Sequence, residues 1–115
     1  DKSRYVHLNS SATSPYMMKT FDTKKEKQEL LIGVMQSYDK TCRIHEVLEE
    51  VNPEYYKIIL EYEKITGEAV ILNTSFNLHG SPIVHTPEEA FYVLDHSGLN
   101  YLAAGNYLIE KKKHE

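Results

Sequence analysis

The sequence predicts an α/β or α+β fold in which a single mixed sheet is flanked by helices. Two stretches, residues 52–67 and 86–98, carry strong helix start and stop signals. Between them, residues 69–72 form the short, charge-free run Ala-Val-Ile-Leu, which is typical of a buried strand. Helices on both sides of a buried strand along the chain indicate that they cover a sheet.

The first half of the chain carries weaker signals. Residues 1–13 are polar and are expected to form an irregular tail. The alternation of residues 15–21 predicts a strand. Residues 23–31 predict a short surface helix that ends before Gly33, with Asp22 or Thr23 as its candidate cap. Residues 43–48 alternate more weakly and predict a further strand.

The two helices of the second half are marked by their caps. Asn52 followed by Pro53 predicts the start of the first helix, and Gly67 predicts its end. Thr86 is the expected N-cap of the second helix, and Glu89 three residues later completes a capping box.

The last part of the chain combines the second helix with two strands. The helix is expected to end at Gly98, and apolar runs at residues 101–104 and 107–109 predict strands. Residues 14–110 are expected to form one domain, followed by a charged tail at residues 111–115. The residues that the second helix is expected to turn inward are Ala90, Phe91, Val93 and Leu94.

Composition excludes several classes of function. The net charge of −4 argues against a protein that binds nucleic acid by neutralising phosphates. No apolar run approaches the ~20 residues of a membrane span, so no membrane partner is expected. The single cysteine, Cys42, excludes an internal disulfide and, without a secretory signal pattern, predicts a cytoplasmic location. The first residue is Asp rather than Met, which suggests a fragment of a longer protein.

The polar stretch that follows the apolar run is the first candidate site. Asn73, Thr74, Ser75 and Asn77 offer two carboxamides, two hydroxyls and backbone N–H groups just past the expected strand end. Such neutral donors suit a phosphate or carboxylate, and Gly80 permits a close approach of the backbone. The alternative is a turn whose polar side chains bond to their own backbone.

A second polar cluster consists of Arg43, Asp39 and Thr41. An arginine suits planar, bidentate recognition of a phosphate or carboxylate. The alternative is an exposed arginine that pairs with a neighbouring glutamate.

Two further chemistries are weighed and set aside. The six histidines show no spacing typical of a metal site, so no protein-built metal site is expected. Cys42 stands three residues before His45, but residues i and i+3 of a strand face opposite sides, which disfavours a thiol nucleophile. A core cysteine is the preferred interpretation.

Five motifs together point to one family. They are SPYM at residues 14–17, DKTCRIH at 39–45, NPEYYKIILEYEKITG at 52–67, VILNTSFNLHGSPIVHTPEEA at 70–90 and GLNYLAAGNYLI at 98–109. Over residues 14–109 the chain resembles the C-terminal domain of NodU/CmcH-type O-carbamoyltransferases. Asn-Thr-Ser-Phe-Asn followed by Gly-X-Pro-Ile and Thr-Pro-Glu is more specific than any single piece.

The resemblance implies a fold and an activity. The fold would be YrdC-like, a twisted mixed sheet around an open polar cavity, truncated here on its N-terminal side. The domain would activate carbamoyl phosphate with ATP and its Mg²⁺, forming a carbamoyl-adenylate and releasing pyrophosphate and phosphate. A separate N-terminal domain of the same chain would hold a metal ion and transfer the carbamoyl group to an acceptor hydroxyl.

The resemblance also implies roles for individual residues. Ser75 and Arg43 would be the principal catalytic groups, as holders of the ligand rather than as covalent nucleophiles. The residues that would line the nucleotide and phosphate site with them are Asn73, Thr74, Asn77, Gly80, Thr41 and Asp39.

The chain departs from the family pattern at several positions. The family usually has His at Ser37, Gly at Lys40, and an Arg and a Glu at His79 and Ser81. Losing that Arg and Glu removes a charged pair beside the polar stretch.

Two alternatives of other classes stay open. One is a non-catalytic packing module whose tyrosine-rich helix face, with Tyr55, Tyr56 and Tyr62, docks on the N-terminal domain. The other is a stand-alone nucleotide-binding module.

Overall fold

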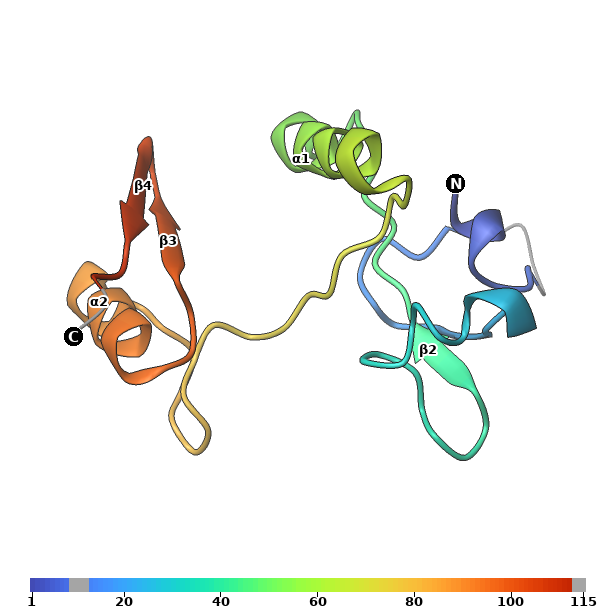
Figure 1. Ribbon diagram of the computed structural model, residues 1–115, viewed down its shortest axis with the longest axis horizontal. Coiled ribbons are helices and arrows are strands. Elements are labelled where there is room, and N and C mark those ends of the chain that lie inside the picture. Colours follow the sequence, from blue (N-terminus) through green and yellow to red (C-terminus); the bar gives the residue numbers. More distant parts are fainter. Residues whose placement is uncertain (9–12, 113–115) are drawn as a thin grey trace. The chain divides into compact units, whose positions relative to one another are not determined.

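The computed structural model describes residues 1–8 and 13–112 and contains both helices and strands (Figure 1). The elements, with η for a 3-10 helix, are η1 (Lys2–Arg4), β1 (Thr20–Asp22), η2 (Lys25–Lys27), β2 (Thr41–Arg43), α1 (Pro53–Thr66), α2 (Pro87–His96), β3 (Tyr101–Ala104) and β4 (Tyr107–Glu110). The chain divides into two compact units, Asp1–Leu72 and Asn73–Glu115, here called the N-terminal and C-terminal units. The predicted α/β or α+β class is confirmed. In place of the expected single mixed sheet, the described residues form two separate two-stranded antiparallel sheets, one in each unit, and each unit has its own core.

The N-terminal unit is built on a two-stranded antiparallel sheet, in which Phe21 of β1 lies opposite Cys42 of β2. Its core consists of Tyr5, Val6, Phe21, Leu31 and Cys42, with Val34, Ile44 and Val70 packed against it. Two of these core residues belong to the segment that was expected to be an irregular tail. Residues 1–8 of that segment are therefore folded, while the position of the domain boundary stays a prediction.

The two strands expected in this unit are shorter and shifted. The strand predicted over residues 15–21 is reduced to β1, because Met17 has a φ of 55°, which interrupts an extended chain. The strand predicted over residues 43–48 lies at β2 instead. Beyond β2 the chain bonds to an irregular segment, with the Glu46 N–H donating to the Ser14 carbonyl oxygen at 2.8 Å.

The surface helix predicted over residues 23–31 is wrong. The structure has only η2 there, followed by hydrogen-bonded turns. The hydroxyl of Thr23, an expected cap, donates to the Lys40 carbonyl oxygen at 2.6 Å, and Lys24 at the N-cap position provides no side-chain acceptor. Without a cap for its first N–H groups, the segment does not extend into an α-helix.

The strand predicted at residues 69–72 is also wrong. These residues are extended but pair with no strand among the described residues (Figure 1). The Ala69 N–H donates to the Tyr5 hydroxyl oxygen at 2.7 Å, and Leu72 leaves 63% of its surface exposed. A β-branched apolar run favours extended backbone, but a strand also needs a neighbour that accepts its hydrogen bonds.

Helix α1 begins and ends where its caps predict. The Asn52 side-chain oxygen accepts a hydrogen bond from the Tyr55 N–H at 3.1 Å, and Pro53 occupies the first turn. Gly67 ends the helix with a φ of 80°, and its N–H donates to the Glu63 carbonyl oxygen at 2.7 Å. No residue of α1 is buried.

The C-terminal unit packs α2 against the antiparallel hairpin of β3 and β4. Its buried cluster consists of Ala90, Leu94 and Leu102, with Phe76, Val84 and Ile109 packed against it. The capping box of Thr86 and Glu89 is present, as predicted. The Lys111 ammonium donates to the Asp95 and Ser97 carbonyl oxygens at 2.9 Å each, which satisfies the end of α2.

The sequence prediction is wrong about one residue of α2, Phe91, which was expected to face inward. Ala90, Val93 and Leu94 are buried as expected, but Phe91 is 45% exposed. The buried residues are spaced i, i+3 and i+4, and a residue at i+1 lies about 100° away around the helix. No helix in the described part of the chain is long and apolar enough to span a bilayer.

Candidate functional site

The segment 73–77, at the start of the C-terminal unit, has no helix or strand and bends at Phe76 and Asn77. Thr74 and Ser75 are exposed, and among the described residues neither hydroxyl has a hydrogen-bond partner. Their backbone N–H groups also donate to no other described residue. The segment therefore presents two hydroxyls and two amides to solvent at adjacent positions.

Unlike Thr74 and Ser75, Asn77 has a side chain that forms hydrogen bonds within its own loop. Its carboxamide nitrogen Nδ2 donates to the Ser81 carbonyl oxygen at 2.8 Å and to the Leu78 carbonyl oxygen at 3.1 Å. A backbone hydrogen bond of 3.0 Å from the Ser81 N–H to the Leu78 carbonyl oxygen tightens the same turn. For Asn77, the alternative of a side chain that bonds to its own loop is what the structure shows.

Residues 76–84 form a loop in the C-terminal unit (Figure 1), and the base of this loop is anchored on the core of the unit. The Val84 N–H donates to the Phe76 carbonyl oxygen at 3.0 Å, and both side chains pack against the buried cluster of α2 and β3. Near its tip Gly80 has a φ of +82°, a conformation that disfavours a Cβ atom. The 76–84 loop is thus held both at its base and near its tip.

The chain leaves the 76–84 loop through the capping box of α2. The Glu89 carboxylate oxygen Oε2 accepts hydrogen bonds from the His85 N–H at 2.7 Å and the Thr86 N–H at 3.0 Å. These two amide donors lower the pKa of Glu89. The direction of the chain into α2 is therefore fixed by bonds that start directly after the loop.

In the N-terminal unit, Asp39 and Thr41 are bonded to each other. The Asp39 oxygen Oδ1 accepts from the Thr41 N–H at 3.0 Å and from the Thr41 hydroxyl at 2.9 Å. The amide of Thr41 is the main cause of the lowered pKa of Asp39. Lys40 between them has a φ of 59°, so the two side chains stabilise a tight turn before β2.

Arg43, the last residue of β2, is exposed and lies opposite Thr20 of β1. Across the described ranges its guanidinium makes no hydrogen bond or ion pair, so the alternative of a pairing with a glutamate is not what the structure shows there. Arg4, the other arginine of the sequence, pairs with Glu63 and donates to the Gly67 carbonyl oxygen at 2.9 Å. One arginine is committed to the fold and the other is available to a ligand.

The predicted site residues thus form two groups, one in each unit. Asp39, Thr41 and Arg43 lie together around the start of β2. The second group, in the C-terminal unit, consists of Asn73, Thr74, Ser75, Asn77 and Gly80.

Sequence reasoning missed the residues that support the second group. Phe76 and Val84 anchor the loop, and the Ser81 carbonyl oxygen accepts a hydrogen bond from the Asn77 side chain. The one available signal was Phe76 itself, because an aromatic residue inside a polar stretch indicates a contact with a core.

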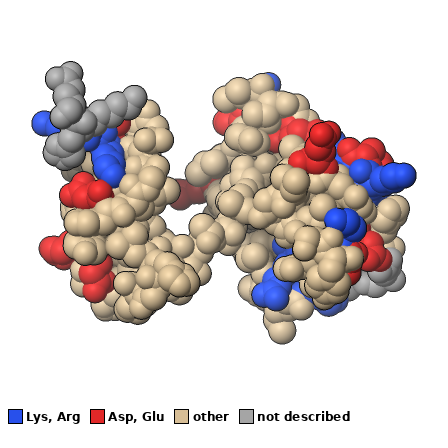
Figure 2. All heavy atoms as spheres, turned by 60° about the horizontal axis from the view of Figure 1, so that its bottom comes forward, with Lys and Arg blue, Asp and Glu red and all other residues tan. Residues whose placement is uncertain are grey.

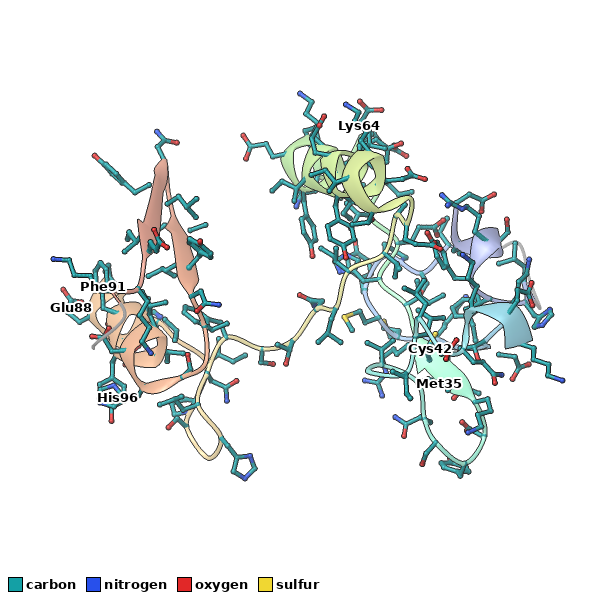
Figure 3. All side chains as sticks on the ribbon, viewed as in Figure 1. Met35, Cys42, Lys64, Glu88, Phe91 and His96 are labelled. Carbon is teal, nitrogen blue, oxygen red and sulfur yellow. The ribbon has the colours of Figure 1, made fainter. Side chains whose placement is uncertain are left out.

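Cys42 lies in the core of the N-terminal unit, where burial raises the pKa of its thiol. Figure 3 shows it next to Met35, with which it forms an isolated β-bridge. A raised pKa leaves the thiol protonated, which is the opposite of what a nucleophile needs. Among the residues with described positions, no three His, Cys, Asp or Glu side chains gather as metal ligands do.

The cations of the N-terminal unit are mostly interspersed with acids on the face drawn in Figure 2, with no continuous basic patch there. Lys2 pairs with Glu46 at 2.7 Å, and Lys27 pairs with Glu68 at 2.5 Å. Paired cations of this kind neutralise charges of the same chain, which leaves them poorly suited to an external polyanion.

Comparison with known proteins identifies relatives that are much longer. An uncharacterized protein of Synechocystis sp. is 33% identical, with 85% of this chain and 19% of that protein aligned. An uncharacterized protein of Methanocaldococcus jannaschii is 39% identical, with 93% of this chain and 21% of that protein aligned. Nodulation protein NolNO of Sinorhizobium fredii is 34% identical, with 97% of this chain and 16% of that protein aligned. The chain spans about one fifth of the length of these curated relatives.

The family comparison agrees with the resemblance found in the motifs. The family described as carbamoyltransferase C-terminus matches residues 1–111, so the match begins earlier than the expected residue 14. It includes the two core residues Tyr5 and Val6, which fold with β1 and β2. This chain belongs to the carbamoyltransferase C-terminus family.

Proposed function

We propose that this chain is the domain of an O-carbamoyltransferase that binds ATP and carbamoyl phosphate. The two substrates react to a carbamoyl-adenylate, with release of pyrophosphate and phosphate, and Mg²⁺ accompanies the ATP. A separate N-terminal domain, with its own metal ion, transfers the carbamoyl group to an acceptor hydroxyl. The buried thiol of Cys42, the single cysteine, fits a reducing cytoplasmic setting for this reaction.

The observation that carries the proposal is the unengaged pair Thr74 and Ser75. Their hydroxyls and backbone N–H groups have no partners among the described residues, directly beside a loop that is held in place. Phosphate oxygens are acceptors, and hydroxyl and amide donors bind them without bringing a charge of their own. Donors that need no rearrangement before binding lose less free energy on association.

Arg43 supports the proposal from the N-terminal unit. A guanidinium has five N–H donors in a planar fork that matches the oxygens of a phosphate. The turn that Asp39 and Thr41 stabilise comes immediately before β2, so Arg43 extends from a defined backbone. In this proposal Arg43 and Ser75 hold the phosphates and the developing negative charge and form no covalent intermediate.

The experiment is ATP–pyrophosphate exchange that depends on carbamoyl phosphate, measured on the full-length protein. Replacing Thr74 and Ser75 together by alanine should lower the exchange rate by at least about tenfold, the effect of losing hydrogen bonds to a charged ligand. Thr13→Ala, an exposed threonine without a bonded partner in the described ranges, is the matched control and should leave the rate unchanged.

One observation favours a second candidate, a non-catalytic module that packs on the N-terminal domain. Helix α1 has no buried residue, and Ile58, Tyr62 and Ile65 stand at i, i+4 and i+7 on one exposed face. Exchange that survives the double substitution of Thr74 and Ser75 would support this packing module. Exchange abolished by that substitution would contradict it.

A further inference from the structure

We propose that Asn77 is a positioning residue that holds the segment before it in place, and that it does not donate to the ligand. The inference rests on the proposed function, because it concerns the same polar stretch. It changes the role expected from the sequence, in which Asn77 was a ligand-binding residue together with Thr74 and Ser75.

The first argument is the number of donors that Asn77 has. A carboxamide carries two N–H donors on its nitrogen and one acceptor oxygen. The nitrogen Nδ2 donates to the carbonyl oxygens of Leu78 and Ser81 at 3.1 and 2.8 Å, which uses both donors. The remaining oxygen Oδ1 is an acceptor and cannot bond to a phosphate oxygen, which is also an acceptor. Asn77 could donate to an anion only by releasing the loop.

The second argument is that the loop is coupled to the segment before it. Phe76 begins the loop, its carbonyl oxygen accepts from the Val84 N–H at 3.0 Å, and its side chain packs against the buried cluster of α2 and β3. Ser75 is covalently joined to Phe76, so a change in the position of Phe76 moves the Ser75 hydroxyl. Asn77, on the other side of Phe76, ties the first residues of the loop to Ser81.

The third argument is that no other described side chain bonds to the tip of the loop, which otherwise keeps only the backbone bond from the Ser81 N–H to the Leu78 carbonyl oxygen. The tip of the loop is made of exposed residues, and Gly80 takes a left-handed conformation that costs backbone entropy to hold. In the described part of the chain, the Asn77 side chain is the only one that forms a hydrogen bond to the carbonyl oxygen of a tip residue, Ser81. Its removal leaves that carbonyl to water and leaves the turn with the single backbone bond from Ser81 to Leu78.

The test uses Asn77→Asp in the full-length protein, with hydrogen exchange and ATP binding measured together. The substitution keeps the size of the side chain but replaces the donor nitrogen by a carboxylate oxygen, which cannot donate to the carbonyl oxygens of Leu78 and Ser81. Hydrogen exchange of the peptide that covers residues 77–86 should become faster, and the dissociation constant for ATP should rise about tenfold. Asn106→Asp, in the exposed turn between β3 and β4, is the matched control and should change neither quantity.

A second variant acts on the same loop without touching Asn77. Gly80→Ala disfavours the left-handed conformation at a φ of +82° and should produce the same pair of effects, faster exchange and weaker binding. A direct contact between Asn77 and ATP predicts something else: Asn77→Asp would weaken binding while exchange of the loop stayed slow. That result, or fast exchange with unchanged binding in both variants, would overturn the inference.

The outcome also separates this inference from the proposed function. If Ser75→Ala weakens ATP binding and both loop variants leave it unchanged, only the positioning role of Asn77 fails. If Ser75→Ala leaves ATP binding unchanged, the proposed function fails, and the inference, which depends on it, fails with it even where exchange of the loop becomes fast.

Discussion

The backbone N–H of Ala69 donates a 2.7 Å hydrogen bond to the hydroxyl oxygen of Tyr5. The two residues are 64 positions apart, and the bond fixes the end of the N-terminal unit to its beginning. Ala69 opens the apolar run that leads to the polar stretch of the candidate site. The bond also satisfies an N–H group that a strand would have paired with a neighbouring strand.

Tyr5→Phe should destabilise the chain. The ring of Tyr5 stays in the core, but the Ala69 N–H loses its acceptor, which costs about 1–2 kcal/mol of the free energy of unfolding. Urea unfolding followed by circular dichroism measures this loss. Tyr16→Phe, at a tyrosine that is 76% exposed, is the control and should change the free energy of unfolding by less than about 0.5 kcal/mol. Equal effects of the two substitutions would contradict the role of the bond.

Glu68 should make the stability of the chain depend on pH. A hydrogen bond from the Lys27 ammonium is the main cause that lowers the pKa of Glu68 below its ordinary value of 4.5. Because the pKa is lower in the folded than in the unfolded state, the carboxylate stabilises the fold above pH 4.5. The contribution disappears as the pH falls through the lower, folded-state pKa.

The comparison of wild type with Glu68→Gln isolates this contribution. When the pH falls from about 6 to about 3, across the ordinary pKa range of carboxyl groups, the wild type should lose more free energy of unfolding than the variant. Only the wild type has a carboxylate at this position to protonate. Urea unfolding at both pH values gives the difference. Parallel losses in the two proteins would mean that Glu68 is not the source.

Lys40→Gly should stabilise the chain. Lys40 has a φ of 59°, a conformation that costs a residue with a Cβ about 1–2 kcal/mol, and glycine gives back about 0.4–1 kcal/mol through the entropy of the unfolded chain. We expect a net gain of about 0.5 kcal/mol in the free energy of unfolding. This also offers a physical reason for the glycine that the resembled family usually has at this position. Lys40→Ala keeps the Cβ atom and should give no such gain.

Removing Arg4 should affect the stability of the chain, and removing Arg43 should affect ligand binding. Arg4→Ala breaks a pair with Glu63 and should lower the free energy of unfolding without affecting ligand binding. Arg43→Ala removes no hydrogen bond or ion pair of the described residues and should leave the free energy of unfolding within about 0.5 kcal/mol. In the full-length protein, the same substitution should weaken binding of carbamoyl phosphate by about tenfold or more. A loss of stability without a loss of binding in Arg43→Ala would assign this residue to the fold.

The features that the sequence predicted well depend on interactions between residues that are close together along the chain. The caps of α1 at Asn52 and Gly67 and the capping box of Thr86 and Glu89 involve partners three or four positions apart, and all are present. The hairpin of β3 and β4 is similarly local, with Ala104 opposite Tyr107.

The features that the sequence predicted wrongly depend on partners far along the chain. Whether residues 69–72 become a strand is decided by the acceptor available to the Ala69 N–H, and that acceptor is the hydroxyl of Tyr5. Thr23 fails as a helix cap because its hydroxyl bonds to Lys40, 17 positions away. No local pattern contains this information.

The candidate site was predicted in part from the sequence. The residue types at Thr74 and Ser75 pointed to an anion, and their local surroundings leave them unbonded among the described residues. The different use of Asn77 could not be read from the sequence, because one carboxamide can serve a ligand or a loop equally well. The geometry of its two carbonyl partners decides the matter.

The most direct test of the account is calorimetric titration of the full-length protein with ATP and carbamoyl phosphate. Ser75→Ala should weaken binding by about 10- to 100-fold, the loss of one hydrogen bond to a charged group, while the melting temperature stays unchanged because the Ser75 side chain bonds to no described residue. Binding of both ligands with wild-type affinity in Ser75→Ala would contradict the central claim.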